Sequence, residues 1–379
     1  MNKHLLYKEL EEWYEVNHRI LPWRETDDPY KIWISEIILQ QTRVAQGMEY
    51  YHRLLTRFPD IQSLAQAEED EVLLYWQGLG YYSRARNMHK AAQLMKNHEI
   101  FHLSNVEGRK SKVESRKLKD EDIFSALRSM PGVGDYTAGA VASFAFNLPY
   151  PALDGNVYRV LSRLYDCEIA FDTTQGKKHF RKLAEELLDR ERPRLFNSAI
   201  MELGALVCLP AKPMCNECPL RTWCKALVNN TVELLPVRKP RAKVKDRYLE
   251  YTIYITPERT TLIHQRKGND IWKHLWEFVE TTSVDFKNDN INNLRGNQLP
   301  AALQRNTSEL SELLNPYKVI EITHVLSHQK LHARFVIKNV SELPEIPDTL
   351  VVSLSELDNY AFSRLTLNAI EKLLLEFAN

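Results

Sequence analysis

The sequence predicts a mainly α-helical N-terminal domain followed by a smaller α+β domain. Up to about residue 205 the apolar residues repeat at helical spacing, whereas beyond residue 247 they alternate with a period of two, as in strands. Residues 229–247 contain Pro236, Pro240 and six Lys or Arg residues, a composition typical of an extended linker. With 379 residues, 44% of them hydrophobic, the chain can form two cores. We therefore predict domains at residues 1–228 and 248–379.

Individual elements follow from local signals. Asp28 and Pro29 are typical of a helix N-terminus and predict a helix over residues 30–41. Helical spacing predicts two more helices near residues 123–130 and 157–164. Strands are expected over residues 248–255 and 331–337, with a helix near residues 365–377. Residues 104–120 are charged and poor in apolar side chains, and we expect a mobile loop whose basic residues could touch a phosphate backbone.

Composition excludes some classes of protein. The sequence contains no apolar run of about 18 residues, and its start lacks the apolar core of a secretion signal, so we expect a cytosolic protein. The net charge is zero, so bulk charge alone does not indicate a nucleic-acid partner. Five cysteines in a cytosolic chain of this size argue against a disulfide framework.

Four of the five cysteines, Cys208, Cys215, Cys218 and Cys224, lie in one short segment. Four thiolates at this density suit a soft metal site. Structural zinc sites usually pair their cysteines at short spacing, and only one CxxC is present here, so the spacing favours an iron–sulfur cluster of the 4Fe–4S type over zinc. Cys167 lies apart and is expected to be a small buried hydrophobic residue.

Residues 130–140 indicate a helix, a Pro-Gly-x-Gly turn and a second helix of small residues. Gly132 and Gly134 let the backbone approach a ligand closely, and the N–H groups at the start of the second helix attract an anion such as a DNA phosphate. An ordinary helix–helix connection explains the pattern equally well.

Two carboxyl groups, Glu36 and Asp154, are candidates for acid–base chemistry. Glu36 has apolar neighbours one helical turn away, and a carboxyl group in such surroundings tends to keep the proton that a general acid needs. Taken alone, Glu36 is better interpreted as the partner of an arginine on a partly buried face. Asp154 precedes a predicted helix and, by position alone, is better interpreted as its N-cap.

Together these features resemble the helix–hairpin–helix DNA glycosylases of the endonuclease III superfamily, and most closely the adenine DNA glycosylases of the MutY type. The resemblance covers about residues 5–228, in the family's order, and implies that the four cysteines hold one 4Fe–4S cluster. The motifs that carry it are LPWR at residues 21–24, WISEIILQQT at 33–42, GLGYYSRAR at 78–86, the glycine hairpin, LDGNV at 153–157, ELGA at 202–205 and the cysteine segment.

The resemblance implies that Glu36 protonates the adenine and that Asp154, with Asn156 beside it, stabilises the cationic sugar. Breaking an N-glycosidic bond in this way requires one protonated and one ionised carboxyl group. Both act on a nucleotide whose base is flipped out of the duplex. Relatives with lyase activity carry a lysine at the position of Tyr136. Without that amine, a monofunctional glycosylase is expected, with Tyr136 hydrogen-bonding in the active site.

The same resemblance implies contacts with the base and the DNA. Ser198 stands where the family usually has glutamate or glutamine, so a pocket contact there is in doubt, and Lys212 could reach a phosphate. The expected adenine-pocket residues are Trp23, Arg24, Leu39 and Met201, the expected duplex wedges are Gln41 and Tyr81, and Thr42, Gly132 and Gly134 complete the expected DNA contacts.

The C-terminal part resembles the Nudix-like domain of the same enzymes through its Trp-Glu-Phe element at residues 276–278. No glutamate-rich Nudix box is found, so pyrophosphate hydrolysis is not expected. Leu326, Ser327 and His328 match the loop that recognises 8-oxoguanine. The family usually has phenylalanine at the position of Leu326. Leucine can still wedge between bases, but stacking is lost and weaker lesion discrimination is expected.

We therefore expect an enzyme that excises adenine mispaired with 8-oxoguanine or guanine in double-stranded DNA. It should be a monomer without membrane contacts, associated with the nucleoid in a bacterial cytoplasm. One alternative is a thymine or oxidised-pyrimidine glycosylase with lyase activity, which Tyr136 and the second domain disfavour. The other is an iron–sulfur protein of electron transfer or redox sensing, which would need neither the hairpin nor the two carboxyl groups.

Overall fold

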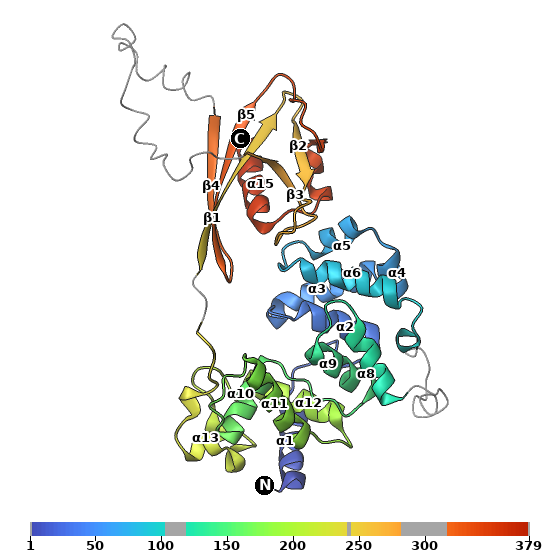
Figure 1. Cartoon of the computed structure of the whole chain (residues 1–379), viewed down its shortest axis with the longest axis vertical. Helices are drawn as coiled ribbons and strands as arrows, with labels where there is room; N and C mark the ends of the chain where they lie inside the picture. Colours follow the sequence, from blue (N-terminus) through green and yellow to red (C-terminus); the bar gives the residue numbers. More distant parts are fainter. Residues whose placement is uncertain (1, 103–118, 241–243, 282–316, 378–379) are drawn as a thin grey trace. The chain divides into compact units, whose positions relative to one another are not determined.

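The computed structural model describes the chain except residues 1, 103–118, 241–243, 282–316 and 378–379, and it divides into two compact units (Figure 1). Unit 1 comprises Met1–Ala67 and Arg86–Arg241, and unit 2 comprises Glu68–Ala85 and Ala242–Asn379. Most of the predicted basic loop, residues 104–118, lies outside the described residues. In the part that is described, no helix is long and apolar enough to cross a bilayer.

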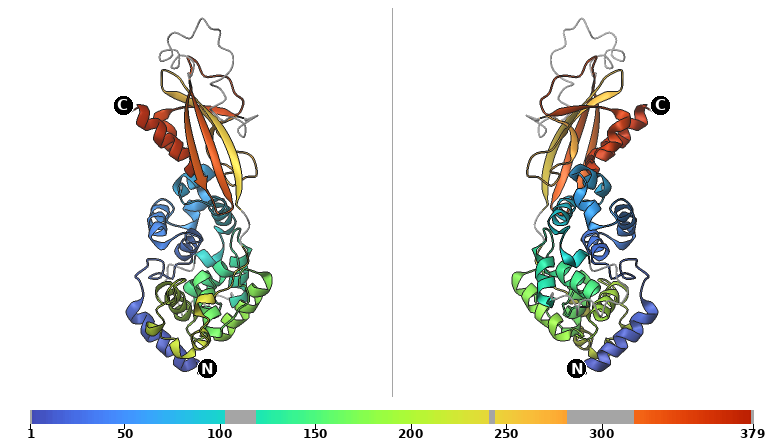
Figure 2. Two further views of the ribbon diagram at one scale, coloured as in Figure 1. Left: turned by 90° about the vertical axis from the view of Figure 1, so that its left-hand side faces the viewer. Right: turned by 90° about the vertical axis from the view of Figure 1, so that its right-hand side faces the viewer.

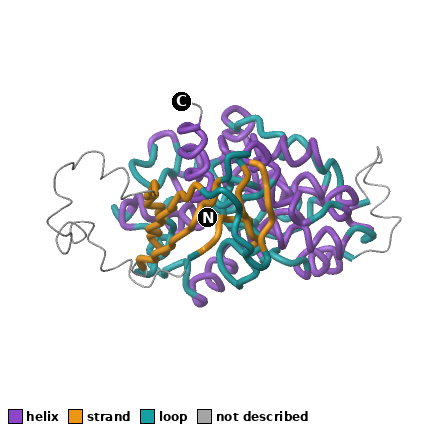
Figure 3. Tube along the Cα trace, turned by 90° about the horizontal axis from the view of Figure 1, so that it is seen from above, coloured by secondary structure: helices purple, strands orange, loops and turns teal. Residues whose placement is uncertain are grey.

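The described elements of unit 1 are helical. Figure 3 colours the helices of the chain purple and its strands orange. Leu161, Phe180 and Leu203 lie in a buried apolar cluster that joins the helices of its C-terminal half. The helices are α1 (Lys3–Asn17), α2 (Pro29–Ile38), α3 (Val44–Arg57), α4 (Ile61–Gln66), η1 (Glu99–Phe101), α8 (Asp120–Ser129), α9 (Asp135–Phe146), α10 (Gly155–Tyr165), α11 (Thr174–Leu187), α12 (Pro193–Leu206), η3 (Cys215–Glu217), η4 (Arg221–Trp223), α13 (Lys225–Val228) and η5 (Val232–Leu234), while α6 (Ser83–Met95) begins in unit 2 and ends in unit 1.

Helix α2 begins as predicted but ends earlier. The Asp28 side chain accepts from the N–H groups of Tyr30 and Lys31, and Pro29 occupies the first turn. The predicted end at residue 41 is wrong, because α2 ends at Ile38 and Gln41 has a left-handed backbone with φ of 60°. This turn takes Gln41 out of the helix, whereas Glu36 stays within its last turn and is 1% exposed.

The glycine hairpin has the predicted form. Helix α8 ends at Ser129, Gly132 adopts φ of 77°, and α9 begins directly after Gly134. A Cβ atom on Gly132 would lie 2.9 Å from the Cβ of Asn87, so both the backbone angle and the space require glycine there. The turn thereby determines where α9 begins, and Tyr136 is the second residue of that helix.

Unit 2 contains a mixed six-stranded sheet with the order β4-β5-β1-β3-β2-β6, which confirms the predicted α+β class. The β1–β5 pair is parallel and the other pairs are antiparallel. Helix α15 (Arg364–Phe377) lies against the sheet, as the two side views in Figure 2 show. The remaining elements are α5 (Glu69–Trp76), β1 (Lys245–Ile255), β2 (Thr260–Gln265), β3 (Trp276–Glu280), β4 (Tyr317–Val325), β5 (Gln329–Asn339), β6 (Thr349–Ser353) and η8 (Leu354–Asn359).

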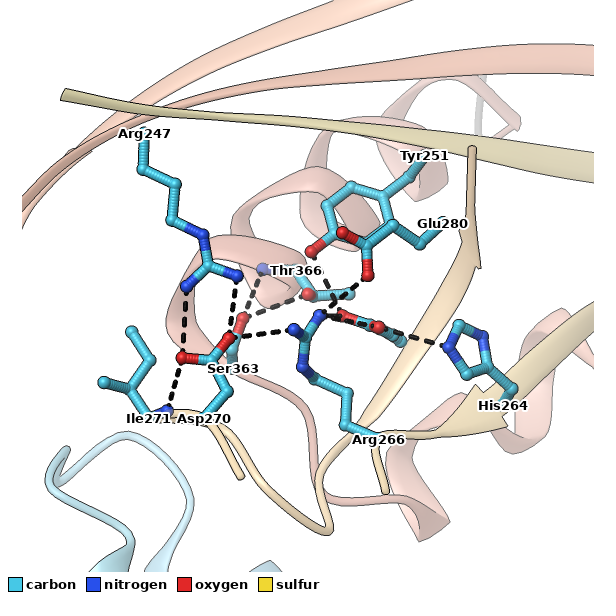
Figure 4. A network of polar contacts seen from close by, with 10 residues as sticks. Arg247, Tyr251, His264, Arg266, Asp270, Ile271, Glu280, Ser363 and Thr366 are labelled. Carbon is cyan, nitrogen blue, oxygen red and sulfur yellow. Dashed lines mark hydrogen bonds and ion pairs between the residues drawn. The ribbon is translucent and has the colours of Figure 1, made fainter. Parts of the chain in front are cut away.

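A buried network of charges holds three strands of unit 2 together (Figure 4). Glu277 of β3 is 2% exposed and accepts hydrogen bonds from Arg266 at 2.6 Å and from Tyr251 of β1 at 3.0 Å. Arg266, directly after β2, also pairs with Asp270, which in turn binds Arg247 at 2.7 Å. Each charge in this network has a partner of opposite sign. Glu277, the glutamate of the Trp-Glu-Phe element, is therefore a compensated buried charge that links neighbouring strands of the sheet.

Candidate active site

A cavity of about 870 Å³ opens in unit 1 among α1, α2, α9, α12 and the start of α10. It is lined by both candidate carboxyl residues, Glu36 and Asp154. It gathers residues that are up to 191 positions apart in the sequence, from Tyr14 to Ala205. The other predicted site residues that line it are Trp23, Arg24, Leu39, Gln41, Thr42, Gly134, Tyr136, Asn156, Ser198 and Met201.

Glu36 is held by a phenol and a guanidinium group. The Tyr136 hydroxyl donates to Glu36 Oε2 at 2.5 Å, and Arg24 Nη1 lies 3.4 Å from Oε1. Arg24 stacks on the Phe144 ring at 3.7 Å from its centroid and points Nη2 at the Met201 sulfur, 3.9 Å away. The arginine partner expected for a partly buried glutamate is thus present, but at the wall of a cavity rather than on an outer face.

Asp154 caps α10 and lines the cavity at the same time. Its Oδ1 accepts from the Val157 N–H at 2.8 Å, which is the N-cap contact, and its Oδ2 accepts from Asn156 Nδ2 at 2.8 Å. Burial raises the pKa of Asp154, the two hydrogen bonds offset part of that rise, and the nearby Glu36 adds to it. The N-cap and the catalytic interpretations are therefore compatible.

Tyr136 is close enough to both carboxyl groups to be affected by their charge. Burial raises the pKa of its phenol well above the usual value, and both Glu36 and Asp154 raise it further. The phenol therefore stays protonated at neutral pH and serves as a hydrogen-bond donor. The predicted hydrogen bond of Tyr136 within the site is present.

Arg159 connects this site to the cysteine segment, and sequence reasoning missed it. One guanidinium nitrogen donates to Asn156 Oδ1 at 2.8 Å and to the Gly204 carbonyl at 2.6 Å, while Nε donates to the Cys208 carbonyl at 2.6 Å. A Cβ atom on Gly204 would lie 2.6 Å from the Asn156 Cβ, so glycine is required at this approach. The available signal was an arginine one helical turn after Asn156, on the buried face of a predicted helix.

The four cysteines of residues 208–224 are free, half-buried and close enough to influence one another's ionisation. Burial raises the pKa of Cys218 to about 12, and the other three thiols contribute to the rise. The buried Arg163 donates to Cys208 Sγ at 3.3 Å and to the Leu209 carbonyl at 2.7 Å. Within the described ranges, no group of three or more His, Cys, Asp or Glu side chains is placed to hold a single metal ion.

The predicted duplex wedges share an unusual backbone. Gln41 and Tyr81 both adopt left-handed angles, with φ of 60° and 49°, and Tyr81 is 44% exposed. Non-glycine residues in this region are uncommon and often mark functional sites. Lys212 also has a left-handed backbone and is exposed in the cysteine segment. Gly132 does not line the cavity, although its neighbour Gly134 does.

In unit 2 the loop of Leu326, Ser327 and His328 forms the turn between β4 and β5. The Leu326 N–H donates to the Gln329 carbonyl, and the His328 carbonyl accepts from Lys245 at the start of β1. The Ser327 hydroxyl lies 2.7 Å from the Tyr81 hydroxyl, which belongs to the same unit. A residue that the resemblance assigns to wedging into the duplex, Tyr81, is therefore in contact with one that it assigns to lesion recognition, Ser327.

Comparisons with known proteins agree with this architecture. A model of the HhH-GPD superfamily of base excision DNA repair proteins matches residues 34–190, and a NUDIX domain model matches residues 250–372. The adenine DNA glycosylase of Buchnera aphidicola subsp. Baizongia pistaciae is 33% identical over 343 residues, 86% of this chain and 84% of that protein. The enzyme of the same name from Homo sapiens is 38% identical over 222 residues, 56% of this chain and 38% of that protein.

One solved structure supports the fold of the helical part. A thermostable thymine-DNA glycosylase matches with a TM-score of 0.50 and 24% identity, covering 60% of this chain and 97% of its own. Together with the two family models, this match confirms the predicted fold class, a helical domain of the helix–hairpin–helix glycosylase type with a Nudix-like domain after it.

Proposed function

This chain belongs to the adenine DNA glycosylase family of DNA N-glycosylases, and from that premise we propose that it hydrolyses the N-glycosidic bond of adenine mispaired with 8-oxoguanine or guanine. The observation that carries the proposal is that Glu36 and Asp154 line one cavity together with Tyr136, whose hydroxyl donates to Glu36. A flipped nucleotide in this cavity would meet a proton donor and an anion at once.

The two carboxyl groups have different roles in the reaction. Glu36 gives its proton to the adenine ring, which makes the base a better leaving group, and the Asp154 carboxylate stabilises the positive charge that develops on the sugar. Asn156 holds Asp154 Oδ2 at 2.8 Å. The nucleophile that attacks the sugar is then water and not a protein amine, because a lyase would need an amine at the position where this chain has the protonated phenol of Tyr136. We infer a monofunctional glycosylase.

Recognition of 8-oxoguanine is proposed for Leu326, Ser327 and His328, and Tyr81 and Gln41 are proposed to wedge into the duplex. The contact between the Tyr81 and Ser327 hydroxyls supports this assignment. It brings the proposed duplex wedge, Tyr81, next to a proposed lesion contact, Ser327, within unit 2. The Leu326 side chain offers an apolar wedge without a ring for stacking. Trp23, Leu39 and Met201 supply the apolar walls of the adenine pocket, and Thr42, Gly132 and Gly134 are proposed DNA contacts.

The first prediction concerns substrate and product. Incubation with duplexes that carry A opposite 8-oxoguanine, A opposite G, T opposite G, or thymine glycol should release base only from the two adenine substrates. Strand breaks should appear on a denaturing gel only after alkali, since hydrolysis leaves an abasic site. Cleavage of the thymine glycol duplex alone, or strand breaks without alkali, would contradict the assignment.

We further propose that Cys208, Cys215, Cys218 and Cys224 hold a 4Fe–4S cluster that ties residues 208–224 into one rigid loop. The donor set supports this, because such a cluster takes four cysteine thiolates, and these four thiols lie close enough together to influence one another's ionisation. Structural zinc sites usually pair their cysteines at short spacing, whereas this segment contains a single CxxC, so the spacing of the four donors favours the cluster over zinc. When bound by these four cysteines, the cluster would supply a structural cross-link of the loop.

Loss of one of the four cysteines should release the cluster. Cys218→Ser should lose most of the bound iron and lower the Tm by about 5 °C or more, because binding of a structural metal is coupled to folding. Iron content and thermal unfolding of the purified protein measure both effects. Cys167→Ser is the matched control, since Cys167 lies outside the segment, and it should leave the iron content unchanged. Equal iron in both variants would remove Cys218 from the ligand set.

The remaining proposals follow from the family and from the DNA substrate. We propose that the domains divide at residues 1–228 and 248–379 with residues 229–247 as a linker, although β1 already begins at Lys245. We also propose that the protein acts as a monomer, in a bacterial cytoplasm at the nucleoid, where its double-stranded DNA substrate lies.

A further inference from the structure

Residues Glu68–Ala85, the wedge segment, belong to unit 2, whereas the chain on both sides of them belongs to unit 1. Contacts in the first turn of its helix α5 tie this segment to unit 2. The Asp70 carboxylate accepts from the side-chain amide of Gln265, the last residue of β2, at 2.7 Å. The Glu69 carboxylate pairs with His274, two residues before β3. The start of α5 is therefore held by residues that flank two strands of the sheet.

The residues after α5 are held by both backbone groups of one residue, Phe362. The side-chain oxygen of Gln77, directly after the helix, accepts from the Phe362 N–H at 2.7 Å. The hydroxyl of Tyr82, which is 3% exposed, donates to the Phe362 carbonyl at 3.1 Å and accepts from the Gly78 N–H at 3.2 Å. Gln77 and Tyr82 lie on either side of Tyr81 in the chain, so the turn that carries Tyr81 is fixed at both ends.

Phe362 is a firm anchor for these two side chains. Its ring is 1% exposed and stacks on Phe278, with 6.3 Å between the ring centroids. The carbonyl of Ala361, directly before it, accepts from the Trp276 N–H at 2.8 Å. Trp276 and Phe278 belong to the Trp-Glu-Phe element of β3, so this element supports the wedge segment through Phe362.

Tyr81 needs such support, because its left-handed backbone is unfavourable for a tyrosine and persists only where the surroundings hold it. Within the turn, the Trp76 indole donates to the Gly80 carbonyl at 3.0 Å, and the Arg84 guanidinium lies 5.7 Å from the centre of the Tyr81 ring. These contacts hold the turn together but do not fix it to the rest of unit 2. The contacts of Gln77 with Phe362 do, and they place the Tyr81 hydroxyl 2.7 Å from Ser327.

We propose that Gln77 and Tyr82 are positioning residues that set the preference for adenine opposite 8-oxoguanine over adenine opposite guanine. The inference rests on the proposed function and deepens it. 8-Oxoguanine differs from guanine in the oxygen at C8 and the hydrogen at N7, and a hydroxyl such as that of Ser327 can bind either group. A hydroxyl rotates to suit its partners, so the bond with Tyr81 restricts its direction. Loosening the wedge segment frees the Ser327 hydroxyl and weakens the recognition of the lesion.

The test measures excision from duplexes with A opposite 8-oxoguanine and A opposite guanine, with protein in excess over DNA but below saturation. Gln77→Met removes the acceptor for the Phe362 N–H, and Tyr82→Phe removes the donor to the Phe362 carbonyl. Each variant should lower the ratio of the two excision rates by about tenfold, the size of one lost hydrogen bond, mainly by slowing excision opposite 8-oxoguanine. Gln77→Glu keeps an acceptor oxygen and should keep the ratio within about threefold of that of the unsubstituted protein.

Tyr30→Phe is the matched control. The Tyr30 hydroxyl also donates to the carbonyl of a phenylalanine, Phe58 in unit 1, at 2.8 Å, and Tyr30 is likewise 3% exposed. Its loss should leave the ratio unchanged. A second comparison uses Tyr81→Phe, which lacks the contact with Ser327. In that background Gln77→Met should lower the ratio no further, because the contact that Gln77 positions is already gone.

Equal loss on both duplexes in Gln77→Met and Tyr82→Phe, or the same further fall in the Tyr81→Phe background, would show a purely structural role and overturn the inference alone. Equal rates on the two duplexes for the unsubstituted protein would also overturn it alone, since there would be no preference to lose, while adenine release would still support the proposed function. Failure to release adenine from either duplex would overturn the proposed function, and this inference with it.

Discussion

Replacing Glu36 with glutamine is expected to lower adenine excision by about 10²- to 10⁴-fold while leaving DNA binding nearly intact. The change keeps the size and the planar shape of a side chain that is 1% exposed. The glutamine oxygen can still accept from the Tyr136 hydroxyl, so the local packing is preserved. What is lost is the proton that the leaving base requires. Single-turnover excision from a duplex with A opposite 8-oxoguanine measures the first effect, and fluorescence anisotropy of the same duplex measures the second.

The matched control for this variant is Glu12→Gln. Glu12 is an exposed glutamate whose only ion pair among the described residues is with Lys8 one turn earlier on α1, and it does not line the cavity. It should retain the full excision rate. If Glu36→Gln excises adenine within about threefold of the unsubstituted protein, general acid catalysis by Glu36 is excluded.

The sequence predicted elements well where one local signal determined them. The N-cap Asp28, the glycine turn at Gly132 and the period-two strands of unit 2 depend on neighbours in the chain, and all three are present. Helix α2 was predicted three residues too long, because the apolar spacing continues to Leu39 while the backbone turns left-handed at Gln41. Helical periodicity gives no information on a single residue, such as Gln41, whose backbone conformation is determined by the turn in which it lies.

Sequence reasoning about the site was limited by contacts between distant segments. Glu36 and Asp154 were named through the resemblance, whereas their own surroundings favoured an ion pair and an N-cap, both of which the structure contains. Arg159 was missed. It donates hydrogen bonds to the carbonyl groups of Gly204 and Cys208, which lie 45 and 49 positions away, and no local spacing predicts such a contact. Its role emerges only when α10 meets α12 and the cysteine segment.

Asp154→Asn should separate catalysis from stability at one position. Asparagine is as good an N-cap as aspartate, so the bond from the Val157 N–H is kept. The anion that stabilises the cationic sugar is lost, and adenine excision should fall by about 10²- to 10³-fold. Because the folded protein raises the pKa of Asp154, its ionised form opposes folding, and this opposition grows as the pH rises through that pKa. Removing the charge at neutral pH should therefore offset the lost contact with Asn156, and the Tm should not fall.

The same pKa shift predicts the acid limb of the pH profile. Excision requires ionised Asp154, so its rate should decline as the pH falls through the raised pKa of this group, at a higher pH than an ordinary aspartate would give. Asn156→Ala removes a hydrogen bond that favours the carboxylate, and should move the acid limb to still higher pH. Single-turnover rates between about pH 4 and pH 8 measure both profiles. A limb at the same pH in the two proteins would mean that a different group controls it, and that the 2.8 Å bond from Asn156 does not hold Asp154 in its charged form.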